Sequence, residues 1–364
     1  MLVRAVEARP LRSLGWLAEE LGPGLTSVIG PNGTGKTNLL EALYFALTGR
    51  SFRTGDRREL IPFGEGLARA EATVATPDGT IHKFVSSISR SDGRRVLLDG
   101  SAAQPADLVR SRPAIAVFSP DRLVLVKGPP AERRAHLDAF VGARRPARAD
   151  LRRRFGQALA QRNALLSRVA SGRSSPTDLD AWDLALAEAA APLIAARGEA
   201  AAELAPLFAA LAAELGLGDA TLSYSPRIDG GVAAIEGALR ERRESDLKLG
   251  RTGTGPHLDE LRIDSGGRSL RRYGSQGQQR IALLALLFAE REALLVARGA
   301  PPLMLLDDVM SELDPEHREL LAARLEGDGQ ALISAADDDA VPERARRQLI
   351  RMPAAARRVE AAAA

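Results

Sequence analysis

Hydrophobic and polar residues alternate along the first part of the chain in a pattern typical of β-strands. Val3–Glu7 and Leu25–Ile29 are predicted strands, and a polar stretch from Arg9 to Pro23 connects them. Farther along, Ala68–Thr76 and Thr80–Ser89 alternate on either side of a Pro-Asp-Gly turn, which predicts a hairpin. Because a hairpin pairs antiparallel strands, we expect a mixed sheet here and not a purely parallel, doubly wound one.

The middle of the chain changes to a helical composition rich in Ala, Leu and Glu. Ala131–Gly142 and Ala147–Ser171 predict two helices, which an Arg-Pro pair separates. Thr177–Gly216 predicts one or two further long helices, interrupted or begun again near Pro192 and Pro206. Together these segments predict a helical insertion in the form of an arm.

Strand-like runs return after the insertion. Ala220–Tyr224 predicts a strand and Ile235–Leu247 a charged helix, and we expect them to lead the chain back to the first region. Leu258–Asp264 and Ser269–Tyr273 flank a Ser-Gly-Gly turn and predict a second hairpin, and an apolar helix, Ile281–Ala289, follows. The pattern therefore predicts an α/β region whose two halves are separated by helices.

The most specific chemical motif follows the strand that ends at Ile29. It matches the phosphate-binding loop G-x-x-x-x-G-K-[ST], whose glycines let backbone N–H groups turn toward phosphate oxygens. Its residues are Gly30, Pro31, Asn32, Gly33, Thr34, Gly35, Lys36 and Thr37, and Asn38 begins the helix after it. A Gly-rich turn can match this pattern by chance, but the flanking strand and helix are the context that the motif requires. We therefore expect nucleotide phosphates at the helix N-terminus, Lys36 on the terminal phosphates and Thr37 as a magnesium ligand.

The scarcity of lysine supports this interpretation. The chain has 50 Lys and Arg residues together, and its lysines are Lys36, Lys83, Lys127 and Lys248. A chain that otherwise uses arginine for positive charge keeps a lysine in the loop, which indicates that a compact ammonium is required there.

Two adjacent carboxylates follow a predicted buried strand near the C-terminus. Four apolar residues, Leu303 to Leu306, precede Asp307 and Asp308. A carboxylate at such a strand end can hold magnesium beside the β- and γ-phosphates, and a neighbouring one can polarise the attacking water. In isolation the pair could equally be a solvated acidic turn, but the phosphate loop makes this improbable. Asp307 is the metal candidate and Asp308 the base candidate, with Lys36 as the third catalytic residue.

A segment rich in Gly and Gln, Gly274 to Arg280, leads into the apolar helix. Ser275 and the glycines of this segment offer side-chain and backbone donors to an anion. Taken alone, the segment is equally well an ordinary helix N-cap. Both interpretations stay open at this point.

Composition narrows the class of protein. The 364 residues are 45% hydrophobic and 27% charged, as is typical of a soluble globular chain with two or three domains. The absence of cysteine excludes disulfides and thiolate metal sites. The sequence has no signal-peptide pattern and no uninterrupted apolar run of spanning length, so we expect a cytoplasmic protein with no membrane partner.

Lys36 and Asp307 are farther apart in sequence than a compact nucleotide domain needs, and the helical insertion accounts for the separation. We therefore expect three parts. Residues 1–130 would carry the phosphate loop, residues 131–248 would form the helical arm, and residues 249–364 would carry the Gly-rich segment and the Asp pair.

Taken together, these motifs resemble a known family. The phosphate loop, the Ser-Gln-Gly-Gln-Gln signature and the block from Leu305 to Asp314 look like the ATP-binding cassette heads of chromosome-maintenance and double-strand-break repair ATPases. More narrowly, the chain is similar to the RecF family of bacterial recombination mediators. The residues that carry this resemblance are Gly35 to Ala42, Gly49 to Arg53, Phe118 to Pro120, Arg133, Arg134, Leu137, Asp138, Gln161 to Asn163, and Gly255 to His257. They extend over nearly the full chain.

The resemblance implies a fold and a way of assembling. The fold would be α/β: an SMC-like P-loop ATPase head with a mixed sheet and antiparallel strands, interrupted by an all-helical arm. ATP and Mg²⁺ would be the cofactors, and ATP would hold two identical subunits together. In such heads the signature of one subunit completes the nucleotide site of the other. The residues in trans would be Ser275, Gln276, Gly277 and Gln278, with Asp314 at the same dimer face.

The resemblance also implies a function. RecF-like proteins are weak, DNA-stimulated ATPases that bind duplex DNA and junctions of duplex with single strands. They act with RecR and RecO in helping to load RecA at gaps. Hydrolysis would separate the dimer and limit its time on DNA.

The sequence departs from the related patterns at three places. Leu258 follows Gly-Pro-His where the family usually has Arg, which puts a basic contact in doubt. Asp308 stands where transporter cassettes have the longer glutamate, and Ile333–Ala336 lacks their histidine. The two differences from transporter cassettes favour a slow, switch-like ATPase with a turnover below about 10 per second. The alternatives are a transporter ATPase subunit, which shares these motifs, and a nucleotide-dependent DNA scaffold with incidental hydrolysis.

Two sets of arginines are candidates for DNA contact. One follows the phosphate-loop helix and the other lies in the insertion: Arg50, Arg53, Arg57 and Arg58, and then Arg144, Arg145, Arg148, Arg152, Arg153 and Arg154. The net charge of +3 by itself favours solvated helix faces, whereas a DNA partner favours phosphate contacts with steep salt dependence. Aromatic residues, at 4%, argue against base stacking as the main mode of binding.

Overall fold

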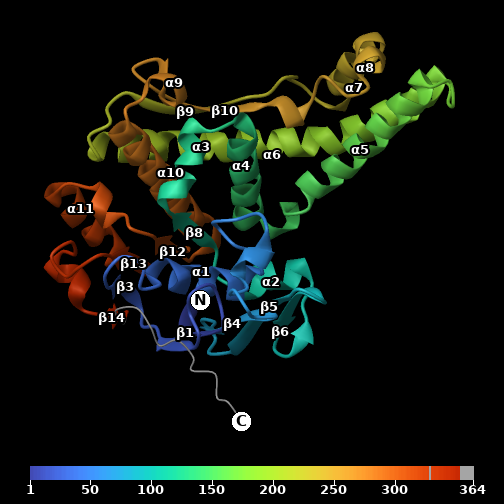
Figure 1. Ribbon diagram of the computed structural model, residues 1–364. Helices are drawn as coiled ribbons and strands as arrows, with labels where there is room; N and C mark the ends of the chain where they lie inside the picture. The colour runs from blue at the N-terminus through green and yellow to red at the C-terminus, as the bar shows by residue number, and fades with distance from the viewer. Residues whose placement is uncertain (328, 353–364) are drawn as a thin grey trace. The chain divides into compact units, whose positions relative to one another are not determined.

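The chain folds into two compact units in the computed structural model, which describes residues 1–327 and 329–352 (Figure 1). The first unit contains Met1–Arg122 together with the chain from Leu294 onward, and the second contains Leu123–Ala293. The Gly-rich signature therefore belongs to the second unit, together with the whole of the expected arm, residues 131–248. The expected division of the chain into three parts, with boundaries at residues 130 and 248, stays a prediction. Residues 353–364 of the third part lie outside the described residues.

One sheet of the first unit has six antiparallel strands in the order β2-β1-β4-β5-β6-β7. Their bounds are β1 Leu2–Arg9, β2 Leu17–Glu20, β4 Leu67–Ala75, β5 Ile81–Ser89, β6 Gly93–Leu98 and β7 Ser101–Ala102. The predicted hairpin is present as β4 and β5, which pair from Leu67 with Ser89 to Ala75 with Ile81. Strand β2 was not predicted, because its four residues lie in a polar stretch and none of them is fully buried.

The other sheet of the first unit is parallel, with the order β14-β3-β13-β12-β8. Its strands are β3 Gly24–Ile29, β8 Ile115–Phe118, β12 Leu303–Leu306, β13 Gln330–Ala335 and β14 Leu349–Arg351. Parallel and antiparallel strands thus belong to separate sheets. Every residue of β12 and β13 is buried, as expected for central strands of a parallel sheet. The carboxyl ends of β3, β12 and β13 reach the same edge, so residues that follow these strands meet there.

Helix α1 (Lys36–Thr48) packs against strands of both sheets, β1, β4 and β5 on one side and β13 on the other. Leu39, Leu40, Leu43, Phe45 and Leu47 are fully buried in a core that both sheets share. The helix that follows the phosphate loop is therefore fixed from two sides. The remaining helices of this unit are α2 Pro105–Ser111 and α11 Pro315–Leu325, with 3₁₀ turns at Arg57–Leu60, Met310–Glu312 and Glu343–Arg346.

The second unit is mainly helical, and it contains a three-stranded antiparallel sheet in the order β11-β10-β9. Its helices are α3 Val124–Lys127, α4 Pro130–Arg144, α5 Leu151–Ala170, α6 Leu179–Glu214, α7 Val232–Glu241, α8 Arg243–Leu249, α9 Leu270–Tyr273 and most of α10 Gln276–Arg298. Its strands are β9 Ala220–Ser225, β10 Glu260–Ser265 and β11 Arg268–Ser269. The predicted strand Ala220–Tyr224 therefore pairs with β10 of this unit and does not return to the first. The predicted second hairpin is present, because β10 and β11 pair antiparallel on either side of Gly266 and Gly267. Its second strand is shorter than predicted, because the chain turns into helix α9 at Leu270.

Helix α6 runs without interruption through 36 residues, although Pro192 and Pro206 lie inside it. The predicted breaks at these prolines are wrong. A proline removes one hydrogen bond and strains the preceding turn, but this helix is rich in alanine and packs against α4, α5, α7 and β9. Tertiary packing thus outweighs the local cost. In the described part of the chain no helix, α6 included, is long and apolar enough to cross a membrane.

A buried polar network joins α5, α6 and α8. Arg162 is 0% exposed, and its guanidinium donates to Asp183 (2.7 Å), Asp246 (2.8 Å) and the hydroxyl of Thr252 (2.8 Å). Asn163 Oδ1 accepts from the backbone N–H of Thr252 at 2.9 Å. The Gln-Arg-Asn motif at residues 161–163 thus holds three helices of the second unit together.

Replacing Arg162 with Met should lower the free energy of unfolding of the second unit by about 3–5 kcal/mol, because the buried carboxylates of Asp183 and Asp246 would each lose an ion pair with a buried guanidinium. Arg153→Met is the matched control, since Arg153 is exposed and its ion pair with Asp150 is worth about 1 kcal/mol or less. Chemical denaturation monitored by circular dichroism measures both. Equal, small effects of the two changes would contradict a structural role for the network.

Candidate nucleotide-binding site

The loop between β3 and α1 has the backbone conformation of a phosphate cradle. Gly33 and Gly35 have φ angles of 84° and 98°, which residues with side chains rarely adopt. A Cβ at Gly33 would meet no atom within 4 Å, so the backbone conformation and not crowding requires glycine there. Gly35 is the N-cap of α1. The loop therefore leads directly into the positive end of a well-packed helix.

Lys36 lies beneath this loop, with only 7% of its surface exposed. Its ammonium donates to the carbonyl oxygens of Gly30 (2.6 Å) and Pro31 (3.1 Å), and to Asn32 Oδ1 (3.4 Å). Thr34 closes the same turn by donating from its hydroxyl to the Pro31 carbonyl (2.8 Å). Since an ammonium has three rotatable donors, Lys36 can exchange these acceptors for phosphate oxygens without moving its buried stem.

Thr37 and Asp307 meet at the carboxyl edge of the parallel sheet. The Thr37 hydroxyl lies 2.8 and 2.9 Å from the two carboxylate oxygens of Asp307 and donates to this carboxylate. Ser334, at the end of β13, donates from its hydroxyl to Asp307 Oδ1 at 2.7 Å. The backbone N–H of Asp307 donates to the Phe118 carbonyl of β8 at 2.8 Å. Three parallel strands and α1 therefore fix the position of this carboxylate.

Asp308 has a strained backbone, with a φ angle of 51°. Its N–H donates to Ser334 Oγ (2.8 Å), and its carbonyl accepts from the Ser311 hydroxyl (2.8 Å). Its half-buried carboxylate lines the same cavity as Lys36 and Thr37. Ser334 thus binds both acidic residues, and it is a site residue that the sequence analysis missed. The signal that could have found Ser334 was its place in the segment Ile333–Ala336, where transporter cassettes have a histidine.

Burial raises the pKa of the Asp307 carboxyl above its ordinary value; the hydrogen bonds from Ser334 and Thr37 oppose this effect, and the charge of Asp308 adds to it. A buried carboxylate of this kind is stabilised by a cation. Among the described residues no three His, Cys, Asp or Glu side chains gather into a metal cluster. Mg²⁺ in nucleotide sites takes only one or two protein ligands and fills its shell with water and phosphate oxygens. Thr37 and Asp307 fit that requirement.

The cavity in front of the loop has a volume of about 670 Å³, and its wall includes Arg12, which was not a candidate from the sequence, and Arg53, which was a candidate only for DNA contact. Arg12, with a φ angle of 54°, donates from Nε and a terminal nitrogen to the fully buried Glu41 of α1 at 2.9 and 3.1 Å. Arg53 lies 3.6 Å from Glu41 and donates to Asn38 Oδ1 at 3.2 Å. Glu41 therefore anchors two guanidinium groups at the cavity wall. No local pattern in the sequence links residues 12, 41 and 53.

The signature segment begins helix α10 in the second unit. The Ser275 N–H donates to Gln278 Oε1 (2.9 Å), and the Gln278 N–H donates to Ser275 Oγ (3.2 Å), which makes a capping box. Ser275, Gln276, Gly277 and Gln278 are all exposed. A Cβ at Gly277 would approach no described atom closer than 3.9 Å, that of Ser275 Oγ. Nothing among the described residues requires glycine at this helical position, although glycine costs about 1 kcal/mol there.

The Gly-Pro-His motif at residues 255–257 has a structural role in the second unit. Asp259, fully buried, accepts from the hydroxyl of Tyr224 and from the backbone N–H of Arg227 (2.8 Å). Arg197 donates to the Pro256 carbonyl (2.6 Å) and to Asp138 (2.7 and 2.9 Å). The motif is thus tied to α4, α6 and β9. Leu258, the departure from the family pattern, is 37% exposed.

The His257 ring gives the second unit a pH-dependent stability. Burial lowers the pKa of His257 below its ordinary value of 6.5, and the ring stacks on Phe155 with centroids 6.0 Å apart. The unfolded chain takes up a proton as the pH falls through about 6.5, whereas the folded protein does not. The contribution of the neutral His257 ring to the free energy of unfolding is therefore complete above about pH 6.5. It is lost as the pH falls toward the lower pKa that His257 has in the folded protein.

We expect the melting temperature of the wild type to fall by about 2–4 °C more than that of His257→Gln between pH 7.5 and 5.5, because the neutral amide cannot take up the proton. Differential scanning calorimetry of both proteins across this range measures the effect. His82→Gln, at an exposed ion pair with Asp99, is the control and should follow the wild type. Parallel curves for wild type and His257→Gln would contradict the assignment.

Comparisons with known proteins agree over nearly the whole chain. Residues 2–359 match the model of the RecF/RecN/SMC N terminal domain. The chain is 36% identical to the DNA replication and repair protein RecF of Heliobacterium modesticaldum, with 90% of both chains covered. It is 38% identical to the RecF protein of an Anaeromyxobacter species, strain K, with 93% of both covered. A solved structure of the recombination mediator protein RecF with ATP, 27% identical, superimposes with a TM-score of 0.86 over 93% of both chains. These likenesses confirm the predicted α/β fold with an SMC-like ATPase head.

Proposed function

Since the chain belongs to the RecF family, within the wider group of RecF, RecN and SMC N-terminal domains, we propose that it is an ATP-hydrolysing recombination mediator that acts on DNA. The observation that carries this proposal is the joining of Thr37 of the phosphate loop to Asp307, with Ser334 bridging Asp307 and Asp308. These residues come from three distant parts of the chain. Their convergence on one cavity is what ATP hydrolysis requires.

Each residue of the cavity has a distinct part in the proposed reaction. The loop N–H groups and Lys36 would bind the β- and γ-phosphates, and Thr37 and Asp307 would hold a magnesium ion. The ion, when bound, would neutralise charge on the phosphates. Asp308 would orient the attacking water and accept its proton, because its carboxylate lies beside Asp307 and is fixed through the strained backbone. Lys36, Asp307 and Asp308 are thus the proposed catalytic residues.

We propose that a second copy of the chain completes the site. Ser275, Gln276, Gly277 and Gln278 are exposed at the start of α10, where a helix N-terminus favours an anion. Gly277 has open space where a side chain would project, and this suits the close approach of another subunit's nucleotide. Asp314, the exposed N-cap of α11, would lie at the same dimer face. ATP would then act as the link between two identical subunits.

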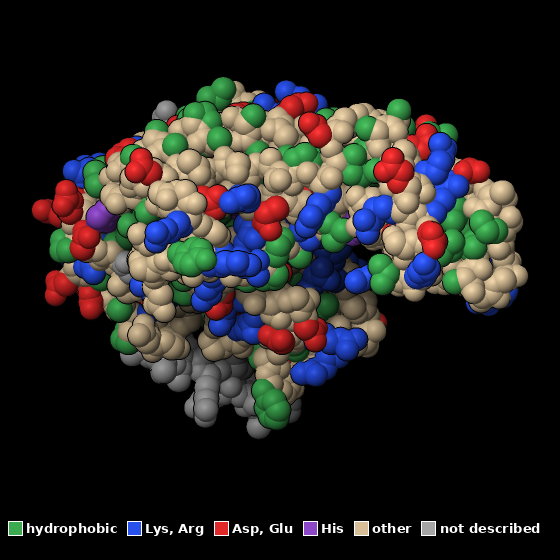
Figure 2. All heavy atoms as spheres, turned by 90° about the horizontal axis from the view of Figure 1, so that it is seen from above, with side chains coloured by type: hydrophobic (Ala, Val, Ile, Leu, Met, Phe, Trp, Pro, Cys, Tyr) green, Lys and Arg blue, Asp and Glu red, His purple; other side chains and the backbone are tan. Residues whose placement is uncertain are grey.

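The two sets of arginines selected from the sequence differ in whether their guanidinium groups form ion pairs within the chain. Those of the insertion are largely engaged within the chain: Arg144 with Glu203, Arg145 and Arg148 with Glu199, Arg152 with Asp138, and Arg153 with Asp150. By contrast, Arg50, Arg57 and Arg58 have no ion-pair partner among the described residues. In Figure 2, Lys and Arg side chains are interspersed with Asp and Glu side chains on the face that is drawn. We propose that Arg50, Arg57 and Arg58 contact DNA phosphates, giving an affinity that falls steeply with salt.

The wider pathway follows from the family. The solved relative is described as a recombination mediator in the RecFOR pathway, so RecR and RecO are the proposed partners and loading of RecA at gaps the proposed outcome. Junctions of duplex and single-stranded DNA would be the substrate, and the protein would act in the cytoplasm. Membership of this family favours repair over the transporter alternative.

Measuring ATP turnover with and without gapped DNA tests the proposal and separates an ATPase from a nucleotide-dependent scaffold. We expect a turnover below about 10 per second that gapped DNA increases. Linear duplex of the same length and charge is the control. A protein that binds ATP and DNA but shows the same negligible hydrolysis with every DNA would be a scaffold, and the proposed ATPase function would fail.

A further inference from the structure

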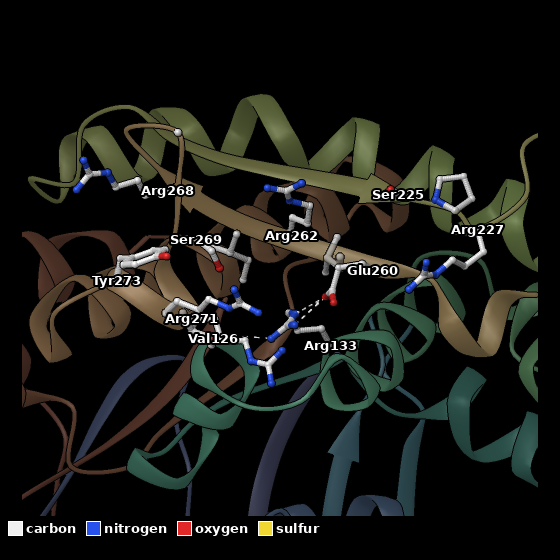
Figure 3. A pocket seen from close by; sticks show the side chains of 15 residues that line it. Val126, Arg133, Ser225, Arg227, Glu260, Arg262, Arg268, Ser269, Arg271 and Tyr273 are labelled. Carbon is white, nitrogen blue, oxygen red and sulfur yellow. Dashed lines mark hydrogen bonds and ion pairs between the residues drawn. The ribbon is translucent and has the colours of Figure 1, made fainter. Parts of the chain in front are cut away.

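A hollow of about 720 Å³ lies wholly within the second unit, where β10, β11 and α9 face α3 and α4 (Figure 3). We infer that this hollow binds the sugar-phosphate backbone of a single DNA strand and stacks one of its bases. The inference rests on the proposed action on DNA and adds a place where unpaired DNA binds. It concerns none of the arginines that the sequence analysis selected.

The hollow carries strong positive charge that the chain does not neutralise. Among the described residues, Arg268, Arg271 and Arg272 are exposed and have no carboxylate within ion-pair distance. Arg227 is exposed at the other end of the hollow, and Arg262, 55% exposed, lies beside Asp264 at 3.1 Å. Like charges that converge without counterions repel one another, so an arrangement of this kind is stabilised by a bound anion.

One carboxylate faces the hollow, and it is already paired. Glu260 accepts from the Nε and a terminal nitrogen of Arg133 at 2.9 and 2.7 Å, as the dashed lines in Figure 3 show. Arg133 also donates to the Gly128 carbonyl at 3.0 Å. This ion pair has no net charge, so Glu260 does not neutralise the exposed arginines around it. Those arginines can bind a ligand that carries several negative charges.

Tyr273 supplies an aromatic surface at one end of the hollow, beside Arg268 (Figure 3). Its side chain is 68% exposed, although a tyrosine of a structured segment usually buries its ring. Base stacking on such a ring is worth about 5- to 150-fold in affinity per base and requires that the base be unpaired. An aromatic ring among arginines therefore favours a single strand over a duplex.

The wall that carries these side chains is held in place by buried packing and by hydrogen bonds. Leu270 is buried and anchors the four-residue helix α9. At Gly274 a Cβ would come within 2.7 Å of the Leu270 carbonyl, so the chain can turn this tightly only with glycine. Gln279 of α10, itself buried, donates to the carbonyl oxygens of Leu270 (2.9 Å) and Gly274 (3.3 Å). Arg271, Arg272 and Tyr273 are thus presented together from one rigid turn.

The chemistry of the hollow distinguishes nucleic acid from an acidic protein segment. An extended row of guanidinium groups suits both ligands, because each brings repeated negative charge. The exposed ring suits nucleic acid better, since bases alternate with phosphates along a strand. The volume is in the range of a cleft for a small ligand, so one strand and not the width of a duplex enters it.

The test compares Arg268→Gln/Arg271→Gln/Arg272→Gln with the wild type in fluorescence anisotropy, using an oligothymidine and a duplex of equal length. We expect the triple variant to bind the single strand about tenfold or more weakly, with a salt slope reduced by about 2. Tyr273→Ala should weaken single-strand binding about tenfold and duplex binding less than about twofold, whereas Tyr273→Phe should keep the wild-type affinity. The control is Arg152→Gln/Arg153→Gln/Arg240→Gln, which removes three exposed, ion-paired arginines of the same unit.

The possible outcomes separate this inference from the proposed function. If the wild type binds no DNA, both fail. If the wild type binds DNA and the triple variant binds the single strand equally well, only the hollow is excluded. If the control variant with three substitutions loses as much affinity for the single strand, the loss follows from the lower net charge of the protein, and the inference is overturned. Polyglutamate serves as the probe for an acidic protein segment. If the triple variant binds DNA like the wild type but loses either the wild-type affinity for polyglutamate or the ATP-dependent dimer, the hollow is a site of protein contact and the inference is overturned.

A second measurement on the unmodified protein avoids the risk that a variant misfolds. Phenylglyoxal modifies accessible arginines, and mass spectrometry locates the products. We expect bound oligothymidine to protect Arg268, Arg271 and Arg272, while Arg153 and Arg240 stay reactive. Equal modification of all five arginines with and without the oligonucleotide, at saturating concentration, would overturn the assignment.

Discussion

Mixing Lys36→Met subunits with Ser275→Arg subunits should restore ATP hydrolysis that neither variant has alone. In a symmetric dimer with shared sites, each mixed pair contains one site with both defects and one site with none. A random mixture should therefore recover up to about a quarter of the wild-type rate per subunit, because half of the dimers are mixed and half of their sites are intact. Each variant alone should fall at least a hundredfold.

The structure gives a reason for each single defect. Lys36→Met keeps the buried stem but removes the ammonium that binds beneath the loop. Ser275→Arg places a bulky cation at an exposed helix start, where loss of the N-cap costs only about 1 kcal/mol and leaves the subunit folded. The first change removes phosphate binding within the subunit, whereas the second removes only what the subunit offers to its partner.

The mixing experiment combines steady-state phosphate release with sedimentation velocity, with and without ATP. The control mixes Lys36→Met with the double variant Lys36→Met/Ser275→Arg, in which no arrangement restores an intact site. No activity in the complementary mixture, despite mixed dimers in the sedimentation profile, would show that each subunit completes its own site. Activity in the control mixture would show that hydrolysis does not require Lys36.

Asp308→Asn should lower the rate of hydrolysis at least a hundredfold while ATP binding and the ATP-dependent dimer persist. The amide has the size of the carboxylate but cannot accept the proton of the attacking water. Asparagine also tolerates the left-handed backbone that Asp308 adopts, so the fold around Ser334 should be kept. The variant should accumulate as an ATP-bound dimer.

Single-turnover hydrolysis and the lifetime of the ATP-bound dimer measure this prediction. Glu59→Gln is the matched control, because Glu59 lines the same cavity with a side chain that is 55% exposed and lies 3.7 Å from Arg12. The control should hydrolyse ATP within about twofold of the wild type. Hydrolysis by Asp308→Asn at the wild-type rate would mean that another group activates the water.

The nucleotide site could be predicted where its information is local. The phosphate loop is a contiguous motif between a strand and a helix, and four apolar residues before Asp307 predict a buried strand end. The meeting of Thr37 with Asp307 also followed, because parallel strands bring their carboxyl ends to one edge. Such patterns depend on neighbouring residues and one general rule of topology.

Other parts of the site depend on contacts between residues that are far apart in sequence. Glu41 looks like any glutamate of a helix, and only the folded chain shows that Arg12 and Arg53 converge on it. No local pattern in the sequence distinguishes Ser334 from other serines. Helix α6 continues through Pro192 and Pro206 because packing outweighs local propensity. The arginine hollow was missed because the segment before the signature matched a strand pattern and turned into helix α9 instead.

The two sheets of the first unit have different consequences for synthesis of the protein. All strands of the antiparallel sheet lie within the first 102 residues, so this sheet can form while the chain is still on the ribosome. The parallel sheet needs β12 and β13, and 270 residues separate Thr37 from Asp307. At bacterial and eukaryotic elongation rates this interval lasts roughly 15 to 50 s. A nascent or truncated chain that ends before Asp307 therefore has a phosphate loop without its acidic partner, and the proposed nucleotide site is complete only after Asp307 and Ser334 have been synthesised.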